Sequence, residues 1–259
     1  MKPRRPIIVA NWKMHKTVQE AENLVKDLLL ELPDLTDTDV VLCPPFIALQ
    51  RVADLVSNTN IRVGAQNMHW EKEGPYTGEI SATMLRSVYS RYVILGHSER
   101  RQYFGETNPT INRKVKAALA SSLRPIVCVG ETLEQREKEN FKVIIQTQIR
   151  ESLDGISADH TEELVVAYEP IWAIGTGQNA SPAQAQEAHT LIRSVLSEIL
   201  GKNEAGKIRI QYGGSVKPTN IKGFFDQPDI DGVLVGGASL DAHRFAAIVR
   251  AAKNENNDP

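Results

Sequence analysis

The chain is poor in cysteine, and this scarcity limits the chemistry that it can carry. Only Cys43 and Cys128 occur among its 259 residues, and each stands in an apolar, strand-like run. Two thiols cannot supply a cluster of metal ligands, and neither a CxxC nor an HExxH motif is present. We therefore expect two reduced thiols in the core, which suits a reducing cytoplasm, and no metal site.

The sequence also lacks a strong bias in charge or hydropathy. Lys and Arg number 30 against 32 Asp and Glu, so the net charge is −2. The absence of a large basic excess to neutralise phosphates argues against a dedicated nucleic-acid binder and leaves a local basic patch open. No run approaches the ~20 apolar residues of a membrane helix. The basic residues 1–6 precede no long apolar run, so we expect no signal peptide and no membrane partner.

What the chain does contain is a regular alternation of short apolar runs with longer amphipathic segments. The apolar runs read as eight strands, at residues 7–10, 40–43, 62–65, 92–95, 125–129, 164–168, 208–212 and 232–235. Continuous apolar strands indicate a parallel sheet covered on both faces. Eight strand–helix units predict an α/β fold, a single closed (β/α)8 TIM barrel, with an open doubly wound sheet as the alternative.

Several helix starts can be read directly from the sequence. Thr17 and Thr132 are each followed three residues later by Glu or Gln, which predicts a capping box. Ser181 begins a third such pattern, with Pro182 at the first helical position. No composition break divides the chain, so we expect one domain over residues 1–259, with residues 253–259 as a frayed polar tail.

Polar residues follow three of the expected strands, at the ends where a barrel places its active site. Asn11 and Lys13 come after the first strand, His97 after the fourth and Glu169 after the sixth. A carboxylate in an apolar pocket can act as a base toward a carbon acid. An amide and an ammonium can stabilise an oxyanion. Taken singly, His97 could be a structural histidine, Lys13 a solvated charge and Glu169 a surface residue.

Two glycine pairs follow the last two strands. These are Gly213-Gly214, before Ser215, and Gly236-Gly237. Glycines let a backbone approach a ligand closely, and this place in a barrel is the usual phosphate site. The alternative is two ordinary turns that need a positive φ. With Lys13 as the nearby cation, the pattern favours a phosphate cradle.

Seven segments, in order along nearly the whole chain, resemble the triosephosphate isomerase family. The longest is residues 168–177, in which Pro170 follows Glu169 and Gly175-Thr176-Gly177 closes a lid-like stretch. Residues 234–239 are another. The other five are Asn11-Trp12-Lys13-Met14, Gly64-Ala65-Gln66-Asn67, Tyr76-Thr77-Gly78-Glu79, Gly96-His97-Ser98-Glu99-Arg100 and Tyr212-Gly213-Gly214-Ser215-Val216.

The resemblance implies an isomerase that interconverts dihydroxyacetone phosphate and D-glyceraldehyde 3-phosphate through an enediolate, without metal or organic cofactor. Glu169 would move a proton between two carbons. His97 would act as a neutral electrophile, and Lys13 would balance negative charge beside Asn11. The substrate phosphate would contact backbone N–H groups at Gly175, Ser215, Gly236 and Gly237.

The resemblance also implies a homodimer. The loop of residues 70–79, from Trp70 to Glu79, would insert into the partner, with Thr77 near the Asn11 and His97 of the partner subunit. The alternative, from the residues alone, is a loop that is simply exposed to solvent. One departure from the family pattern is Gln178-Asn179 after Gly177, at the hinge of the lid, and its effect on lid motion is not predicted.

Three other functions compete with this one. A Schiff-base aldolase would need a lysine from the interior strands, but the sixth strand ends in Glu169. A metal-dependent epimerase would need clustered His and carboxylate ligands, which the strand ends lack. A non-catalytic barrel would bind a phosphate ligand without turning it over.

Overall fold

Eight parallel strands close into a barrel in the computed structural model, which describes residues 4–33, 36–138, 140–173 and 180–252. The strands are paired in chain order, and β1 pairs with both β2 and β8. Their bounds are β1 Ile7–Asn11, β2 Asp39–Cys43, β3 Arg62–Ala65, β4 Tyr92–Leu95, β5 Arg124–Val129, β6 Val165–Tyr168, β7 Arg209–Tyr212 and β8 Gly232–Val235. The predicted (β/α)8 barrel is confirmed, and the open sheet is excluded because β8 pairs with β1.

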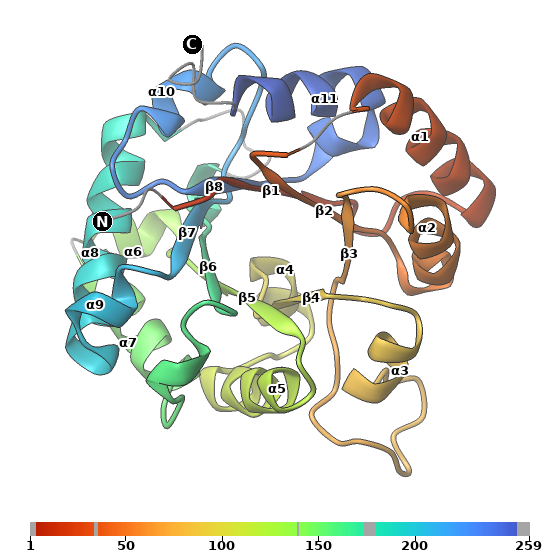
Figure 1. The fold of residues 1–259 in the computed structure, drawn as a ribbon. Coiled ribbons are helices and arrows are strands. Elements are labelled where there is room, and N and C mark those ends of the chain that lie inside the picture. Colours follow the sequence, from red (N-terminus) through yellow and green to blue (C-terminus); the bar gives the residue numbers. More distant parts are fainter. Residues whose placement is uncertain (1–3, 34–35, 139, 174–179, 253–259) are drawn as a thin grey trace.

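Helices surround the barrel on its outside (Figure 1). The α-helices are α1 Val18–Glu31, α2 Leu49–Val56, α3 Ala82–Ser87, α4 Ser98–Tyr103, α5 Asn108–Ala120, α6 Leu133–Glu137, α7 Phe141–Ser152, α8 Pro182–Leu200, α9 Lys202–Ala205, α10 Ile221–Phe225 and α11 Ala242–Ala251. Four 3-10 turns are η1 Phe46–Ala48, η2 Ala158–His160, η3 Ile171–Ala173 and η4 Gly237–Leu240. No helix among the described residues has both the length and the apolar character needed to cross a bilayer.

The three predicted capping boxes begin their helices as expected. Thr17, Thr132 and Ser181 each accept a hydrogen bond from the third helical residue, whose side chain bonds back. Thr107 begins a fourth box, in which Thr110 takes the place of Glu or Gln. That variant was not predicted, because a threonine at the third position is not part of the usual pattern.

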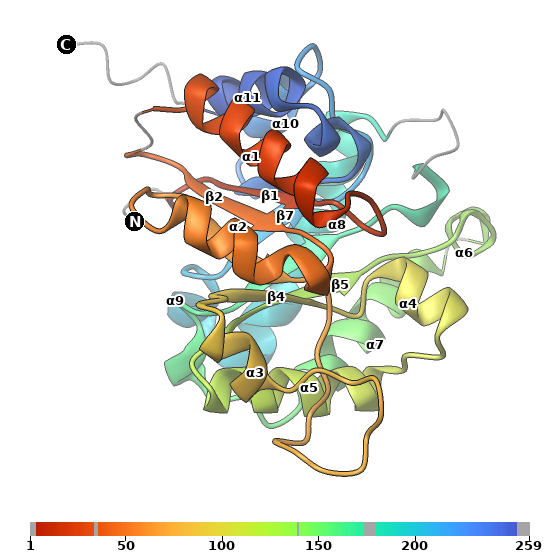
Figure 2. The ribbon, with the colours of Figure 1, turned by 90° about the vertical axis from the view of Figure 1, so that its right-hand side faces the viewer.

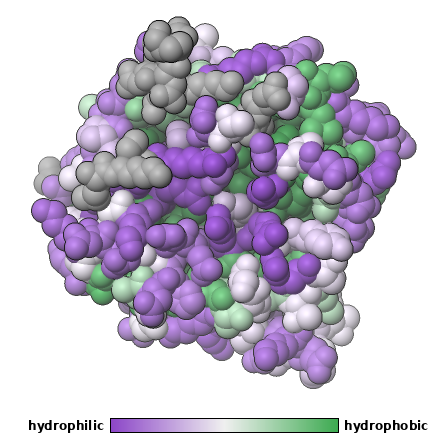
Figure 3. Space-filling model, in the orientation of Figure 1, coloured by the Kyte–Doolittle hydropathy of each residue, from purple (hydrophilic) through white to green (hydrophobic). Residues whose placement is uncertain are grey.

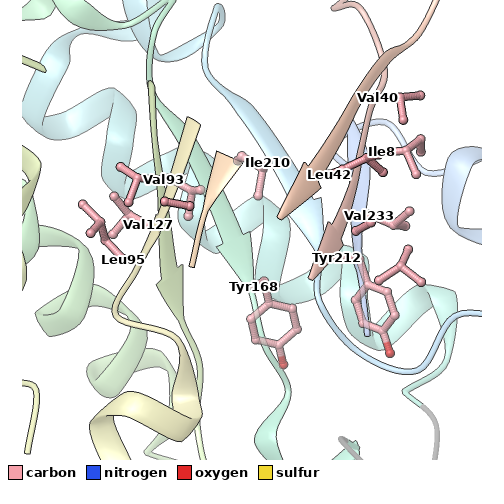
Figure 4. Close-up of a cluster of buried hydrophobic side chains, with 14 of the residues drawn as sticks. Ile8, Val40, Leu42, Val93, Leu95, Val127, Tyr168, Ile210, Tyr212 and Val233 are labelled. Atoms are coloured by element: carbon pink, nitrogen blue, oxygen red, sulfur yellow. The ribbon is translucent and has the colours of Figure 1, made fainter. Parts of the chain in front are cut away.

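The core has two layers because successive strand residues point to opposite faces. One set of side chains fills the barrel, including Ile7, Val9 and Ile126. The other packs between the strands and the helices, and Figure 4 shows part of this outer layer, with Ile8, Leu42 and nearby residues. Both cysteines are buried and free, as predicted.

The two ends of the barrel differ. Figure 2 shows α4 and α6 at one end, with the amino-terminus and α9 at the other. Strands run toward the end that carries α4, because α4 follows β4 directly. The predicted site residues Asn11, His97 and Glu169 stand at this carboxyl end, so the barrel collects side chains from distant parts of the sequence.

Candidate active site

Glu169 follows β6 at the carboxyl end of the barrel and is almost fully buried, with 1% of its surface exposed. Its backbone N–H donates to the carbonyl of Val129 at 2.7 Å, which ties it to the end of β5. The neighbouring Gly130 is packed so closely that an added Cβ would lie 1.8 Å from the Glu169 carbonyl oxygen. The position of the carboxylate is thus set by rigid strands, and the view that Glu169 is a surface residue is wrong.

Donors on His97, Ser98 and Cys128 surround the Glu169 carboxylate. Oε1 lies 3.0 Å from Nε2 of His97 and accepts a bond from Ser98 Oγ at 3.1 Å, and Oε2 accepts one from Ser98 N–H at 3.0 Å. Burial by itself would raise the pKa of Glu169. The positive charge of a protonated His97 and the hydrogen bonds from His97, Ser98 and Cys128 outweigh burial and lower the pKa. The carboxylate is therefore ionised and able to accept a proton.

His97 joins the carboxylate to the start of α4, where it is the residue before the first helical turn. Its Nδ1 accepts a hydrogen bond from Glu99 N–H at 3.3 Å, which requires an unprotonated Nδ1. The other nitrogen, Nε2, then carries the proton that faces Glu169. Burial lowers the pKa of His97, but the charge and hydrogen bond of Glu169 raise it overall. The hydrogen bond that Nδ1 accepts, by contrast, favours the neutral imidazole.

Lys13 stands at the entrance to the site in a strained backbone conformation, with φ at 53°. The Asn11 side chain stabilises this turn by accepting from Lys13 N–H at 3.0 Å, and Gln66 Nε2 donates to the Lys13 carbonyl at 2.8 Å. The ammonium contacts Glu99 Oε1 at 2.6 Å. Lys13 is therefore held in place by three partners rather than solvated, and such strain is typical of functional sites.

A cavity of about 740 Å³ opens beside these groups, large enough for a small phosphorylated substrate. Asn11, Lys13, His97 and Glu169 line it together with both glycine loops and two cations that the sequence did not predict, Lys217 and Arg244. The loop residues on its wall include Gly213, Gly214, Ser215, Gly236 and Gly237.

The four loop glycines, Gly213, Gly214, Gly236 and Gly237, do not adopt a positive φ, so the alternative of turns that need one is not supported. Close packing explains two of them: a Cβ on Gly214 would lie 2.1 Å from the hydroxyl oxygen of Tyr212, and one on Gly213 would lie 3.0 Å from Glu169 Cγ. A Cβ on Gly237 would meet no atom within 4 Å. This open space suits close approach by a ligand. Gly175, the remaining predicted phosphate contact, lies outside the described residues.

Sequence reasoning missed several groups around the site. Ser98 supplies two of the bonds to Glu169, although its place in the segment Gly96–Arg100 predicted no such role. Buried Glu131 accepts from Tyr168 at 2.9 Å, Trp172 at 2.9 Å and Arg136 at 3.2 Å, which anchors the segment after Glu169. A lone Glu after a strand gave no signal for this role, because two of its partners, Tyr168 and Trp172, belong to a segment that the closed barrel brings beside the end of β5.

Within the described part of the chain, no three His, Cys, Asp or Glu side chains gather as metal ligands would. The arrangement instead offers a buried carboxylate base, an imidazole proton donor, a cation and a glycine-lined hollow within one cavity. Such a set can remove a proton from carbon and stabilise the resulting oxyanion.

Comparison with known proteins agrees with this geometry. The family model described as "Triosephosphate isomerase" matches residues 6–252. Triosephosphate isomerase of Moorella thermoacetica is 56% identical over 246 residues, which cover 95% of this chain and 98% of that protein. The enzyme of Carboxydothermus hydrogenoformans is 53% identical over 249 residues, which cover 96% of this chain and 99% of that protein. The chain therefore belongs to the triosephosphate isomerase family.

Proposed function

We propose that this chain interconverts dihydroxyacetone phosphate and D-glyceraldehyde 3-phosphate, with Glu169 as the base. Glu169 takes a proton from the carbon beside the carbonyl, which leaves an enediolate, and returns it to the neighbouring carbon. Neutral His97 donates to the substrate oxygens, and Lys13 with Asn11 balances the negative charge. The phosphate binds N–H groups at Ser215, Gly236, Gly237 and, in the undescribed lid, Gly175.

One observation carries this proposal: the buried Glu169 carboxylate contacts His97 at 3.0 Å in the same cavity as Lys13 and both glycine loops. A general base must reach its proton, and a rigid strand end provides that accuracy. An isomerisation that only moves protons needs neither metal nor cofactor.

The competing reactions find less support. A Schiff-base aldolase needs a lysine inside the barrel, whereas the buried Lys114 lies on α5 and bonds to Glu106 and Asn67. A metal-dependent epimerase needs a ligand cluster, and none forms among the described residues.

Steady-state isomerisation of D-glyceraldehyde 3-phosphate in a chelated, metal-free buffer tests the proposal. We expect full turnover in the presence of chelator. A protein that binds inorganic phosphate but does not isomerise the substrate would be a non-catalytic barrel. Activity that disappears with chelator would point to a metal-dependent reaction.

We also propose a homodimer formed through residues 70–79. This loop projects from the body between β3 and α3 (Figures 1 and 2). Tyr76 is 42% exposed, and Met14 and Ile47, from other loops at the carboxyl end of the barrel, are 94% and 71% exposed. A contiguous exposed apolar patch typically marks a contact, and we take these three side chains as parts of one. Thr77, an exposed residue of this loop, would reach the partner's active site.

Sedimentation of the wild type and of a variant with a shortened 70–79 loop tests the dimer. We expect a wild-type dimer and a variant monomer with reduced kcat. A wild-type monomer with full activity at the assay concentration would overturn the proposal.

We further propose that the chain forms one domain and that the protein is cytoplasmic. The two free, buried thiols support the cytoplasmic location.

A further inference from the structure

The amino end of the barrel, opposite the active site, carries a second concave site. A hollow of about 340 Å³ lies there, lined by Asp39, Arg62, Arg91, Tyr92, Ser122 and Arg124. Figure 3 views the molecule from this end and shows strongly hydrophilic residues gathered across its middle. The hollow lies where strands begin, so it does not share residues with the active-site cavity.

The barrel brings three arginines of this hollow together from separate segments. Arg62 begins β3, Arg91 immediately precedes β4, and Arg124 begins β5. Arg91 N–H donates to the carbonyl of Val63, and Arg124 N–H donates to the carbonyl of Arg91, both at 2.8 Å. Since adjacent strands lie about 4.8 Å apart, the three side chains start from neighbouring positions on one rim. We call Arg62, Arg91 and Arg124 the floor site.

Among the described residues, no carboxylate forms an ion pair with a floor-site arginine, although Arg124 also borders a hollow that carries acidic residues. The one carboxylate that lines the hollow, Asp39, already binds Arg5 at 2.9 Å and Arg209 at 2.5 Å. Of the three floor arginines, Arg62 donates to the carbonyl of Thr59 at 3.0 Å and Arg124 to the Tyr92 hydroxyl at 3.2 Å. These are neutral acceptors, so the full charges remain.

Other arginines of the molecule show the contrasting arrangement. Arg51 pairs with Glu22 at 2.8 Å, and Arg100 pairs with Glu106 at 2.6 Å. Three exposed like charges on one rim repel one another, and an anion between them would offset that repulsion. The floor site therefore has the composition of a binding site rather than of a paired surface.

We propose that the floor site binds a compact anion built from linked phosphate groups. A guanidinium offers a planar fork of donors that matches phosphate oxygens, and three forks on neighbouring strands can engage more than one phosphate. Arg124 also lines a second hollow, together with Asp159, Glu162 and Glu163. These carboxylates repel an anion on that side, so the anion would bind between the floor-site arginines. The same acidity, with the net charge of −2, disfavours a long nucleic acid.

Calorimetric titration with inorganic tripolyphosphate at low ionic strength tests this proposal. Equilibrated triose phosphate is included to fill the active-site cavity. We expect one bound tripolyphosphate per chain, binding that is tighter than that of orthophosphate, and weakening as salt is added. Adenosine triphosphate is the second probe. If it binds more tightly than tripolyphosphate, the base also makes contacts and the ligand is a nucleotide; otherwise the ligand is free condensed phosphate.

The double variant Arg62→Gln/Arg91→Gln should weaken tripolyphosphate binding by at least about tenfold, because charge-assisted hydrogen bonds are lost. Its kcat/KM should equal that of the wild type, which also shows that it is folded. Lys142→Gln removes an exposed charge from α7 and should leave the affinity unchanged. The single variant Arg91→Gln gives an intermediate affinity.

Equal affinity in the double variant and in Lys142→Gln would overturn the proposal. So would binding that disappears when triose phosphate fills the other cavity, or tripolyphosphate that binds no more tightly than orthophosphate. Because turnover is measured separately, failure of the floor site and failure of the proposed isomerase activity are distinguishable.

Discussion

At the scale of single residues, the contacts that hold Glu169, the proposed base, are ones that a substrate would have to replace. Glu169 shares its carboxylate between His97 and Ser98. Both donors therefore keep the base ionised in the absence of a ligand, and the pKa of Glu169 is lowered despite burial. The site is thereby prepared for proton abstraction near neutral pH.

Ser98→Ala tests this role of Ser98. A lowered pKa keeps Glu169 ionised to lower pH, so removing one donor must raise the pKa. The acid limb of the kcat/KM profile should move to higher pH, by up to about one unit for one hydrogen bond. The control Ser87→Ala removes a hydroxyl that bonds only to the Met84 carbonyl on α3. An acid limb that stays in place in Ser98→Ala would show that the hydroxyl does not tune the base.

His97→Gln tests the proposed electrophile. Glutamine keeps a donor but cannot relay a proton between adjacent oxygens, so kcat should fall by at least about 10²-fold. Inhibition by inorganic phosphate should change little, because the glycine loops that bind phosphate are untouched. If phosphate inhibition weakened as much as kcat fell, His97 would be a binding or structural residue instead.

At the scale of elements, the strand ends are positioned by close backbone packing. Gly130 lets the end of β5 lie against Glu169, since a Cβ there would approach the Glu169 carbonyl oxygen to 1.8 Å. The bond from Glu169 N–H to Val129 ties the same two strand ends together. The position of Glu169 thus depends on Gly130, a residue with no side chain.

Gly130→Ala should displace the end of β6 and misplace the base. A shift of about 1 Å can cost 10²-fold in rate, and overpacking costs about 1–3 kcal/mol of stability. We expect a lower kcat and a lower Tm, measured by steady-state kinetics and calorimetry. Gly223→Ala on α10 is the control, because its nearest neighbour is the Pro182 ring at 3.1 Å. Wild-type kcat in Gly130→Ala would contradict the packing argument.

These elements also show what the sequence could and could not predict. The apolar runs located every strand, with ends within one residue, because buried parallel strands are continuously apolar. Asn11, Lys13, His97 and Glu169 could be placed at one end because strand direction determines where a side chain emerges. The bonds from Ser98 to Glu169 and from Trp172 to Glu131 could not, because they join segments whose distance depends on the closed barrel.

At the scale of the whole molecule, burial of a neutral histidine couples stability to pH. His189 on α8 is fully buried, and its Nδ1 lies 3.0 Å from the Asp229 carbonyl. Burial lowers its pKa to about 4. The unfolded chain, with an ordinary pKa of about 6.5, therefore binds the proton first as pH falls. Stability from this group is complete above about pH 6.5 and is lost on acidification toward pH 4.

His189→Leu should flatten this dependence. The wild type should lose up to about 3 kcal/mol of unfolding free energy between pH 6.5 and pH 4 through this group, and the variant should not. Denaturant unfolding at several pH values measures the slope, which is independent of any constant loss of stability. His15→Gln, an exposed histidine, should leave the slope unchanged. The same slope in wild type and His189→Leu would rule out the coupling.

The central proposal is that Glu169 transfers a proton between two carbons of the substrate, and isomerisation in D₂O measures this transfer most directly. Abstraction and return of a carbon-bound proton through an ionised base exposes that proton to solvent, so wild-type product should gain deuterium at carbon. Glu169→Gln keeps the size of the side chain but removes the acceptor. Its kcat and its rate of deuterium incorporation should fall together, by about 10²–10⁴-fold. Incorporation at the wild-type rate in a folded Glu169→Gln variant would contradict the assignment of Glu169 as the base.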